Sequence, residues 1–398
     1  MSLDTPIYLD HHATTPCDPR VLEAMLPWFT ESFGNASSAT HRFGWAAEAA
    51  VDDARERLGR AIGAGDSREI VFTSGTTESD NLALFGVVRA AGGPAGCHVV
   101  TTAIEHPAVL DPCRALERDG CEVTRVPVDR EGRVDPAAVA AALTERTCLV
   151  SVMAANGEIG TLQPLAEIGA VCRERGVLFH TDAAQAAGKL SLAVDALGVD
   201  LLSMCAHKLY GPKGVGLLYV RARRPRLPLA PLFHGGGQEH GRRPGTLPVP
   251  LLVGFARAVE LCLEDLAAES ARIATLRDRL WERLARGLPE ARRNGSAEER
   301  LPGNLNVCIP GIEADAVIAG LKDVALSAGS ACASASGEPS HVLRAIGLSD
   351  AEARASLRFG LGRSNTAGEI DRVAERVIEE ARALLERGPG SGRRLRRG

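Results

Sequence analysis

Short apolar runs alternate with amphipathic stretches through the middle of the chain, between Glu69 and Val220. Each run is rich in Val, Leu and Ile and too short for an ordinary helix, which favours a buried strand. The expected strands are Ile70–Phe72, His98–Val100, Val123–Val126, Leu149–Met153, Val177–Phe179, Leu201–Met204 and Val215–Val220. Strands that alternate with helices in this way predict an α/β fold with a largely parallel sheet and helices on both faces.

The pattern changes near residue 250. Pro250 to Leu288 carries apolar residues at helical spacing with few breakers, which predicts a long helix that links the sheet to a second domain. The elements expected after it are a strand at 305–309, a helix at 314–322, a loop through Ser336, a helix at 339–346, a strand at 356–359 and a helix at 367–385. We therefore expect a large sheet domain followed by a smaller α+β domain.

Polar residues that could take part in catalysis or ligand binding follow the ends of the expected strands. They are Thr76, Thr77, His106, Asn156, Asp182 and Lys208. In open α/β sheets the ligand lies at the carboxyl ends of the strands. Asp182 and Lys208 have the layout of a pyridoxal-phosphate site, in which a lysine holds the cofactor aldehyde as an imine and an acid keeps the pyridine nitrogen protonated.

Composition narrows the class of protein. The chain has 398 residues, 45% of them hydrophobic, and a formal net charge of -4, so nothing in its charge balance favours nucleic acid or a membrane as partner. Its ten cysteines include no CxxC pair, and no secretory signal precedes them, so we expect reduced thiols in the cytoplasm. No metal site is expected. Motifs of zinc proteases, P-loop hydrolases and dinucleotide-binding enzymes are absent from the sequence.

Five motifs carry a resemblance to a known family. They are Tyr8-Leu-Asp-His-His-Ala-Thr-Thr-Pro16, Thr73-Ser-Gly-Thr-Thr-Glu-Ser79, His180-Thr-Asp-Ala-Ala-Gln185, Cys205-Ala-His-Lys-Leu-Tyr-Gly-Pro-Lys-Gly214 and Ser327-Ala-Gly-Ser-Ala-Cys-Ala-Ser334. Together they resemble the group I cysteine desulfurases of iron-sulfur cluster and nitrogenase assembly, which are class V aminotransferase-like pyridoxal-phosphate enzymes. The resemblance implies fold type I, similar to aspartate aminotransferase. It also implies a large domain over 16–255 and a small domain formed by 1–15 with 256–386. The basic, Gly-rich composition of residues 387–398 predicts a disordered tail.

The resemblance implies a set of cofactor contacts. Thr76, Thr77 and His207 would contact the phosphate, and Cys205 stands where many relatives have a serine that donates to it. Asn156 and Gln185 would hydrogen-bond the phenolic oxygen. Thr246 would reach the cofactor phosphate of a neighbouring subunit, which implies a homodimer.

The remaining roles concern the substrate. His106 would stack on the pyridine ring and move protons near L-cysteine. Arg358 would bind the substrate carboxylate, because a planar guanidinium can donate two parallel hydrogen bonds to a carboxylate. An exchange of roles between Arg358 and Arg363 stays open. Asn156 would also help to hold the substrate carboxylate.

Cys332 is the residue that would distinguish a desulfurase from other enzymes of this fold. It lies in a run of small residues that is a poor core segment and a good mobile loop, so its thiol is expected to be exposed. The resemblance implies that Lys208 and His106 move protons while Cys332 takes the sulfur of L-cysteine as a persulfide, for donation to an acceptor such as an iron-sulfur scaffold protein. The alternatives are a selenocysteine lyase, another aminotransferase-like enzyme, and a non-catalytic sulfur-carrier scaffold.

Overall fold

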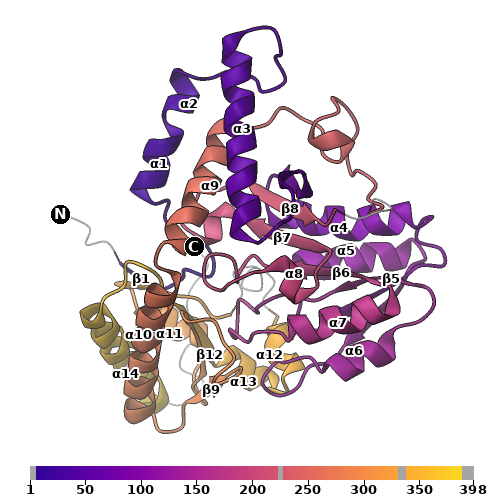
Figure 1. The fold of residues 1–398 in the computed structure, drawn as a ribbon. Helices are drawn as coiled ribbons and strands as arrows, with labels where there is room; N and C mark the ends of the chain where they lie inside the picture. Colours follow the sequence, from indigo (N-terminus) through magenta and orange to yellow (C-terminus); the bar gives the residue numbers. More distant parts are fainter. Residues whose placement is uncertain (1–5, 223–226, 330–337, 388–398) are drawn as a thin grey trace, which may run out of the picture.

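The computed structural model describes residues 6–222, 227–329 and 338–387. A large sheet lies beside a smaller group of strands and helices, with the chain crossing between them near its start and again after α9 (Val249–Leu263) (Figure 1).

The large sheet contains all seven strands that the sequence predicted, with ends shifted by a few residues. They are β2 (Ile70–Thr73), β3 (His98–Thr102), β4 (Glu122–Val126), β5 (Thr147–Ser151), β6 (Leu178–Asp182), β7 (Leu201–Cys205) and β8 (Gly216–Val220). Their order is β2-β8-β7-β6-β5-β3-β4, and only β8 runs antiparallel to its neighbours. This mainly parallel α/β sheet confirms the predicted fold class.

Side chains alternate between two hydrophobic layers along each strand. Val99 and Leu149 contribute to the layer under α4 and α5, whereas the next residues, Val100 and Val150, face the opposite layer. Both faces are therefore apolar, which explains why the strands read as continuous apolar runs in the sequence. The covering helices are α3 (Arg42–Ala61), α4 (Thr76–Ala90), α5 (Pro107–Arg118), α6 (Pro136–Ala142), α7 (Leu165–Arg175) and α8 (Val194–Leu197).

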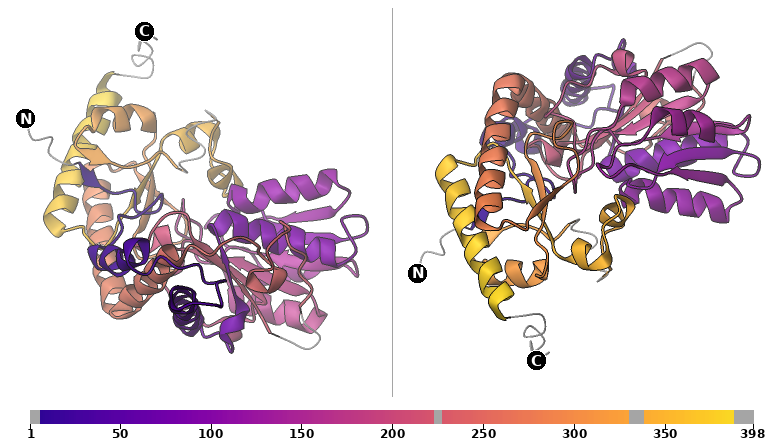
Figure 2. Two further views of the ribbon diagram at one scale, coloured as in Figure 1. Left: turned by 90° about the horizontal axis from the view of Figure 1, so that it is seen from above. Right: turned by 90° about the horizontal axis from the view of Figure 1, so that it is seen from below.

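The smaller group of elements lies beside the large sheet (Figure 2). It has a hydrophobic core of its own. Its sheet has the order β12 (Ser356–Gly360), β10 (Asn304–Cys308), β9 (Arg292–Asn294), all antiparallel, while β1 (Ile7–Tyr8) pairs with β11 (Val324–Ala325) in parallel. Its helices are α10 (Leu266–Gly287), α11 (Ala314–Gly320), α12 (His341–Ala345), α13 (Asp350–Arg354) and α14 (Ala367–Arg387). Leu9 joins this core from the start of the chain. The domain boundaries given above stay a prediction.

The single long helix expected over 250–288 is two helices. α9 ends at Leu263, and α10 begins at Leu266 after Asp265 adopts a non-helical conformation. α9 packs against α1 (Pro19–Met25) and α3, whereas α10 packs against α14, so the break lets one apolar stretch serve two cores. Additional short elements are α2 (Pro27–Thr30) and the 3-10 turns η1 (Ser67–Glu69), η2 (Ala206–Lys208) and η3 (Glu239–Gly241). No described helix is long and apolar enough to cross a membrane.

Candidate active site

Lys208 ends the turn η2, directly after β7. Its Nζ donates hydrogen bonds to the backbone carbonyls of His12, at 2.5 Å, and Ala13, at 2.7 Å. Burial lowers the pKa of the Lys208 ammonium. A lysine in such surroundings loses its proton more readily than an exposed one, and the neutral amine is the form that attacks a carbonyl carbon.

Asp182 is the last residue of β6 and is only 7% exposed. Its Oδ1 accepts a hydrogen bond from the backbone N–H of Ala184 at 2.8 Å. Burial raises the pKa of the Asp182 carboxyl, and the charges of His106 and Lys208 act in the opposite direction. The three groups therefore lie within electrostatic range of one another, at the carboxyl edge where the sequence placed them.

The start of α4 forms a cradle that suits a phosphate. The N-cap residue Gly75 offers no side chain to cap the helix, and Thr76 Oγ1 is buried without a hydrogen-bond partner among the described residues. The nearby Cys205 thiol is a weak hydrogen-bonding group and cannot fully satisfy this hydroxyl. A Cβ at Gly216 would lie 2.6 Å from the Cα of Gly75, so glycine there lets β8 pass close to the cradle. A helix start with spare donors binds anions.

His207 and Gln185 connect this region to the N-terminal segment. His207 Nδ1 lies 3.1 Å from Thr14 Oγ1. Gln185 Oε1 lies 2.9 Å from His12 Nδ1, and its Nε2 donates to the His12 carbonyl, also at 2.9 Å. Because Lys208 donates to the same carbonyl, His12 joins Gln185 to the lysine.

The predicted pyridoxal phosphate fits these residues. The cradle at Thr76 suits its phosphate, the buried Asp182 carboxyl suits the nitrogen of its ring, and the Lys208 amine suits its aldehyde. All three belong to the carboxyl edge of one sheet, on β6, on η2 after β7 and on α4 after β2.

Asn156 makes contacts that define the turn it begins. Its Oδ1 accepts from the backbone N–H groups of Glu158, at 2.8 Å, and Ile159, at 3.0 Å, while Nδ2 donates to the carbonyl of Ile104 at 3.0 Å. These bonds use most of the carboxamide and make Asn156 a structural centre of this turn. Its predicted contact with the cofactor stays a prediction.

His106 caps α5. Its Nδ1 accepts from the backbone N–H of Ala108 at 3.1 Å, which leaves Nε2 as the nitrogen that carries a proton in the neutral ring. The surrounding protein lowers the pKa of the imidazole although the ring is exposed, and Asp182 opposes that shift. With Thr77, His106 lines a pocket of about 480 Å³ between α4 and α5.

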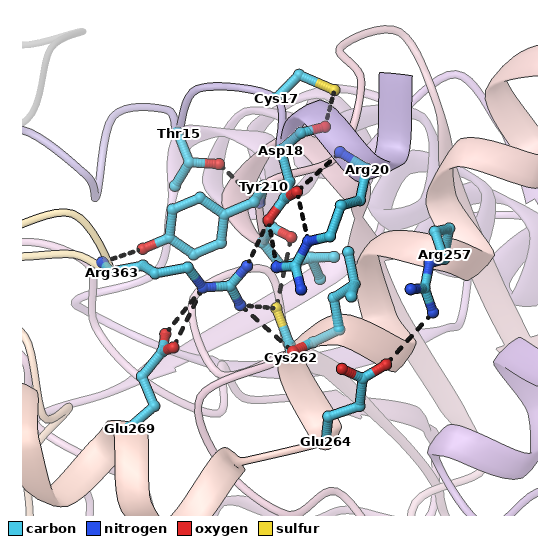
Figure 3. Close-up of polar contacts among 12 residues, drawn as sticks. Thr15, Cys17, Asp18, Arg20, Tyr210, Arg257, Cys262, Glu264, Glu269 and Arg363 are labelled. Carbon is cyan, nitrogen blue, oxygen red and sulfur yellow. Dashed lines mark hydrogen bonds and ion pairs between the residues drawn. The ribbon is translucent and has the colours of Figure 1, made fainter. Parts of the chain in front are cut away.

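The two arginines of β12 and the following loop have different surroundings. Arg358 is 4% exposed; its Nη2 binds Asp10 Oδ1 at 2.7 Å, its Nη1 donates to the Gly157 carbonyl at 3.3 Å, and its Nε has no partner among the described residues. Arg363 instead lies between Glu269 and Asp18, over the ring of Tyr210 (Figure 3). Arg363 is thus held in a structural ion-pair cluster, and Arg358 is the better placed of the two to bind a carboxylate.

Two predicted residues cannot be placed in the same way. Thr246 is exposed, next to Gly245, whose N–H donates to Gln238 Oε1. Cys332 lies outside the described residues. Conversely, Asp10 and His12 hold Arg358 and Gln185 in place, and sequence reasoning gave neither a role, although both stand in the motif Tyr8–Pro16 that carried the resemblance.

Comparisons with known proteins agree over nearly the whole chain. The family model described as aminotransferase class-V matches residues 7–373. The chain is 54% identical over 384 residues to "Cysteine desulfurase IscS" of Anaeromyxobacter sp. (strain Fw109-5), covering 96% of this chain and 94% of the relative. It is 51% identical to "Cysteine desulfurase, mitochondrial" of Drosophila melanogaster, covering 96% and 82%.

Solved structures give the same picture. A "NifS-like protein" superposes with a TM-score of 0.87 at 36% identity, covering 94% of this chain and 99% of that one. A structure titled "SspA in complex with cysteine" gives a TM-score of 0.79 at 40% identity, covering 89% and 98%. The chain therefore belongs to the aminotransferase class-V family of pyridoxal-phosphate enzymes, and within it to the group I cysteine desulfurases.

Proposed function

We propose that the protein converts L-cysteine to L-alanine and transfers the sulfur to Cys332 as a persulfide. The observation that carries this proposal is the group of Lys208, Asp182 and His106, whose charges act on one another at the carboxyl edge of the sheet. The relatives named cysteine desulfurase, at up to 54% identity, and the neighbour solved with cysteine support the choice of substrate.

The chain's own residues divide the chemical work. Pyridoxal phosphate, when bound, supplies an electron-withdrawing ring that stabilises negative charge at the substrate Cα. Asp182 keeps a proton on the ring nitrogen, because its buried carboxylate gains from a nearby positive charge. The Lys208 amine and His106 Nε2 hold and move the proton at Cα.

The other residues bind rather than react. Thr76, Thr77, Cys205 and His207 would hold the phosphate. Asn156 and Gln185 would hold the phenolic oxygen.

Arg358 positions the substrate by its carboxylate. The Asp10 carboxylate and the Gly157 carbonyl fix the guanidinium, and the unpartnered Nε shows that its donors are not all used by the described residues. A substrate carboxylate bound there would place the amino acid beside Lys208, since the charge of Arg358 also acts on the pKa of Lys208.

The sulfur step balances without an external oxidant. A bond forms between the Cys332 sulfur and the substrate sulfur while the substrate C–S bond breaks. The electron pair of that bond and a proton remain on the substrate carbon, which gives alanine.

The test is a product assay. The purified protein, loaded with pyridoxal phosphate and given L-cysteine and a thiol reductant, is expected to form alanine and sulfide in equal amounts. The same assay with L-selenocysteine separates the desulfurase from a selenocysteine lyase. Formation of alanine without sulfide, or of neither product from L-cysteine, would reject the proposed reaction.

An exposed apolar surface supports the proposal of a homodimer. It covers α1, α2 and the start of α3, at the top of Figure 1, and consists of Leu22, Leu26, Phe29, Phe33, Phe43 and Trp45. Phe33 is 64% exposed, and its ring stacks on Phe43 at 5.3 Å. Large exposed apolar side chains gathered on neighbouring helices are typical of an interface.

The dimer can be tested by charge insertion. Leu26→Asp combined with Phe33→Asp is expected to convert a dimer into a monomer in light scattering, because each aspartate would be buried unpaired in the interface. Leu385→Asp on α14 is the matched control, since Leu385 is 42% exposed but distant in the fold. A monomeric wild-type protein, or an unchanged mass for the double variant, would contradict the dimer.

The acceptor and the location are part of the proposal. We infer a cytoplasmic enzyme that passes sulfur to an acceptor protein such as an iron-sulfur scaffold. The nine cysteines that the structure describes are all free thiols, as expected in a reducing compartment.

A further inference from the structure

Glu158 is a buried acid that the mechanism above leaves without a role. It is 4% exposed, and its Oε1 has no hydrogen-bond partner among the described residues. Burial raises the pKa of the carboxyl, while the Ser340 hydroxyl and the charge of Arg358 act in the opposite direction. A buried carboxyl without full hydrogen bonding is costly, so its presence calls for an explanation.

Folding of the turn does not require this carboxyl. The backbone N–H of Glu158 donates to Asn156 Oδ1 at 2.8 Å. Its carbonyl accepts from Asn304 Nδ2 at 3.3 Å and from Asn306 Nδ2 at 3.1 Å. The main chain is therefore fixed on both sides, and the side chain is free to serve another purpose.

The Glu158 carboxyl is close to two positions of the chain, Gly329 and Ser340. An added Cβ at Gly329 would lie 3.1 Å from Oε1, and the φ of +117° at this position also favours glycine. The Ser340 hydroxyl is a hydrogen-bond partner of the carboxyl. Along the sequence, these two positions flank the residues that include Cys332.

Each flanking segment is also tied to a candidate substrate residue. The backbone N–H of Arg358 donates to the carbonyl of Ser327 at 2.7 Å. His341 Nε2 lies 3.0 Å from the carbonyl of Glu105, the residue before His106. Glu158 thus occupies the point where the chain before Gly329 and the chain after Ser340 meet the substrate-binding side of the site.

We propose that Glu158 is a positioning residue for sulfur transfer: its carboxyl fixes the segments at Gly329 and Ser340 against the Arg358 side of the site. It contacts neither substrate nor cofactor in this role, and it acts through the geometry of the segments that flank Cys332. The inference rests on the proposed function.

The test separates sulfur transfer from cofactor and substrate binding. Glu158→Ala and Glu158→Gln are compared with Glu167→Ala, an exposed acid on α7. Three quantities are measured: the visible absorbance of the loaded cofactor and its change when L-cysteine is added, kcat and KM for alanine formation, and the persulfide on Cys332 after one turnover, by alkylation and mass spectrometry.

We expect Glu158→Ala to lower kcat and the rate of persulfide formation about tenfold or more, since a small misplacement of reacting groups has effects of this size. The cofactor absorbance, its response to L-cysteine and KM stay close to wild type. Glu158→Gln, which keeps the shape and an acceptor for Ser340, is expected to restore most of the rate.

Other outcomes would overturn the inference. Glu158→Ala that transfers sulfur as fast as Glu167→Ala, or that loses the cofactor response in proportion to kcat, would give Glu158 no positioning role. If Glu158→Ala does not fold, Glu158→Asp decides: slow transfer with an intact cofactor response supports the role, and normal transfer rejects it. A wild-type protein that makes no alanine would reject the proposed function instead.

Discussion

Replacement of Lys208 by alanine is expected to remove the visible absorbance of lysine-linked pyridoxal phosphate and to lower alanine formation about ten-thousandfold. The structure gives the reason, because the Lys208 amine is partly buried, has a lowered pKa and shares the carboxyl edge of the sheet with Asp182. Loss of a residue that is proposed both to attach the cofactor and to move a proton would combine two large effects. Absorbance spectra and single-turnover alanine assays measure them separately.

Two further lysines allow this prediction to be tested against a control and against an alternative. Lys213 is exposed and five positions later in the same motif, so Lys213→Ala is the matched control and should leave both signals unchanged. Lys189 is the competitor: burial lowers its pKa to about 8, and its Nζ donates to the Gln185 carbonyl at 3.1 Å. If Lys208→Ala kept the lysine-linked absorbance and Lys189→Ala lost it, the assignment of Lys208 would be wrong.

The strands of the large sheet could be predicted because their environment is uniform. A parallel strand buried on both faces needs apolar residues at successive positions, and that requirement is local and visible in sequence. The break between α9 and α10 could not be predicted in the same way. It falls at Glu264 and Asp265, with neither glycine nor proline to mark it, and it arises because the two helices pack into different cores.

The candidate site also contains residues that the sequence could place and residues that it could not. Asp182 ends β6 and Lys208 lies in the turn directly after β7, so topology alone brings them to one edge. The pairing of Arg358 with Asp10 spans 348 positions, and no local pattern announces a contact between residues so far apart. The choice between Arg358 and Arg363 depended on the same kind of information, since only the folded chain surrounds Arg363 with Asp18, Glu269 and Tyr210.

Cys332→Ala is the second substitution from which we expect a near-complete loss, with sulfide formation lowered about a thousandfold. The other cysteines give the argument. Burial raises the pKa of Cys113 and Cys172 to about 12 and that of Cys121 to about 11. Since the thiolate is the nucleophile, thiols of this kind are inert at neutral pH. Among the described cysteines only Cys17 is exposed, and burial of part of its side chain still raises its pKa.

Cys17 therefore serves as the control, and among the described cysteines it is also the alternative candidate for the sulfur-accepting nucleophile. It lies two residues from Thr15, which donates to the His207 carbonyl at 2.9 Å, so it is close to the site in the chain as well as open to solvent. We expect Cys17→Ala to keep full activity, and Cys332→Ala to keep the cofactor's spectral response to L-cysteine while forming no persulfide and no alanine. A response to substrate without turnover would show that substrate binding and proton movement do not need the Cys332 thiol. Sulfide formation that survives Cys332→Ala and falls with Cys17→Ala would move the sulfur acceptor to the N-terminal segment.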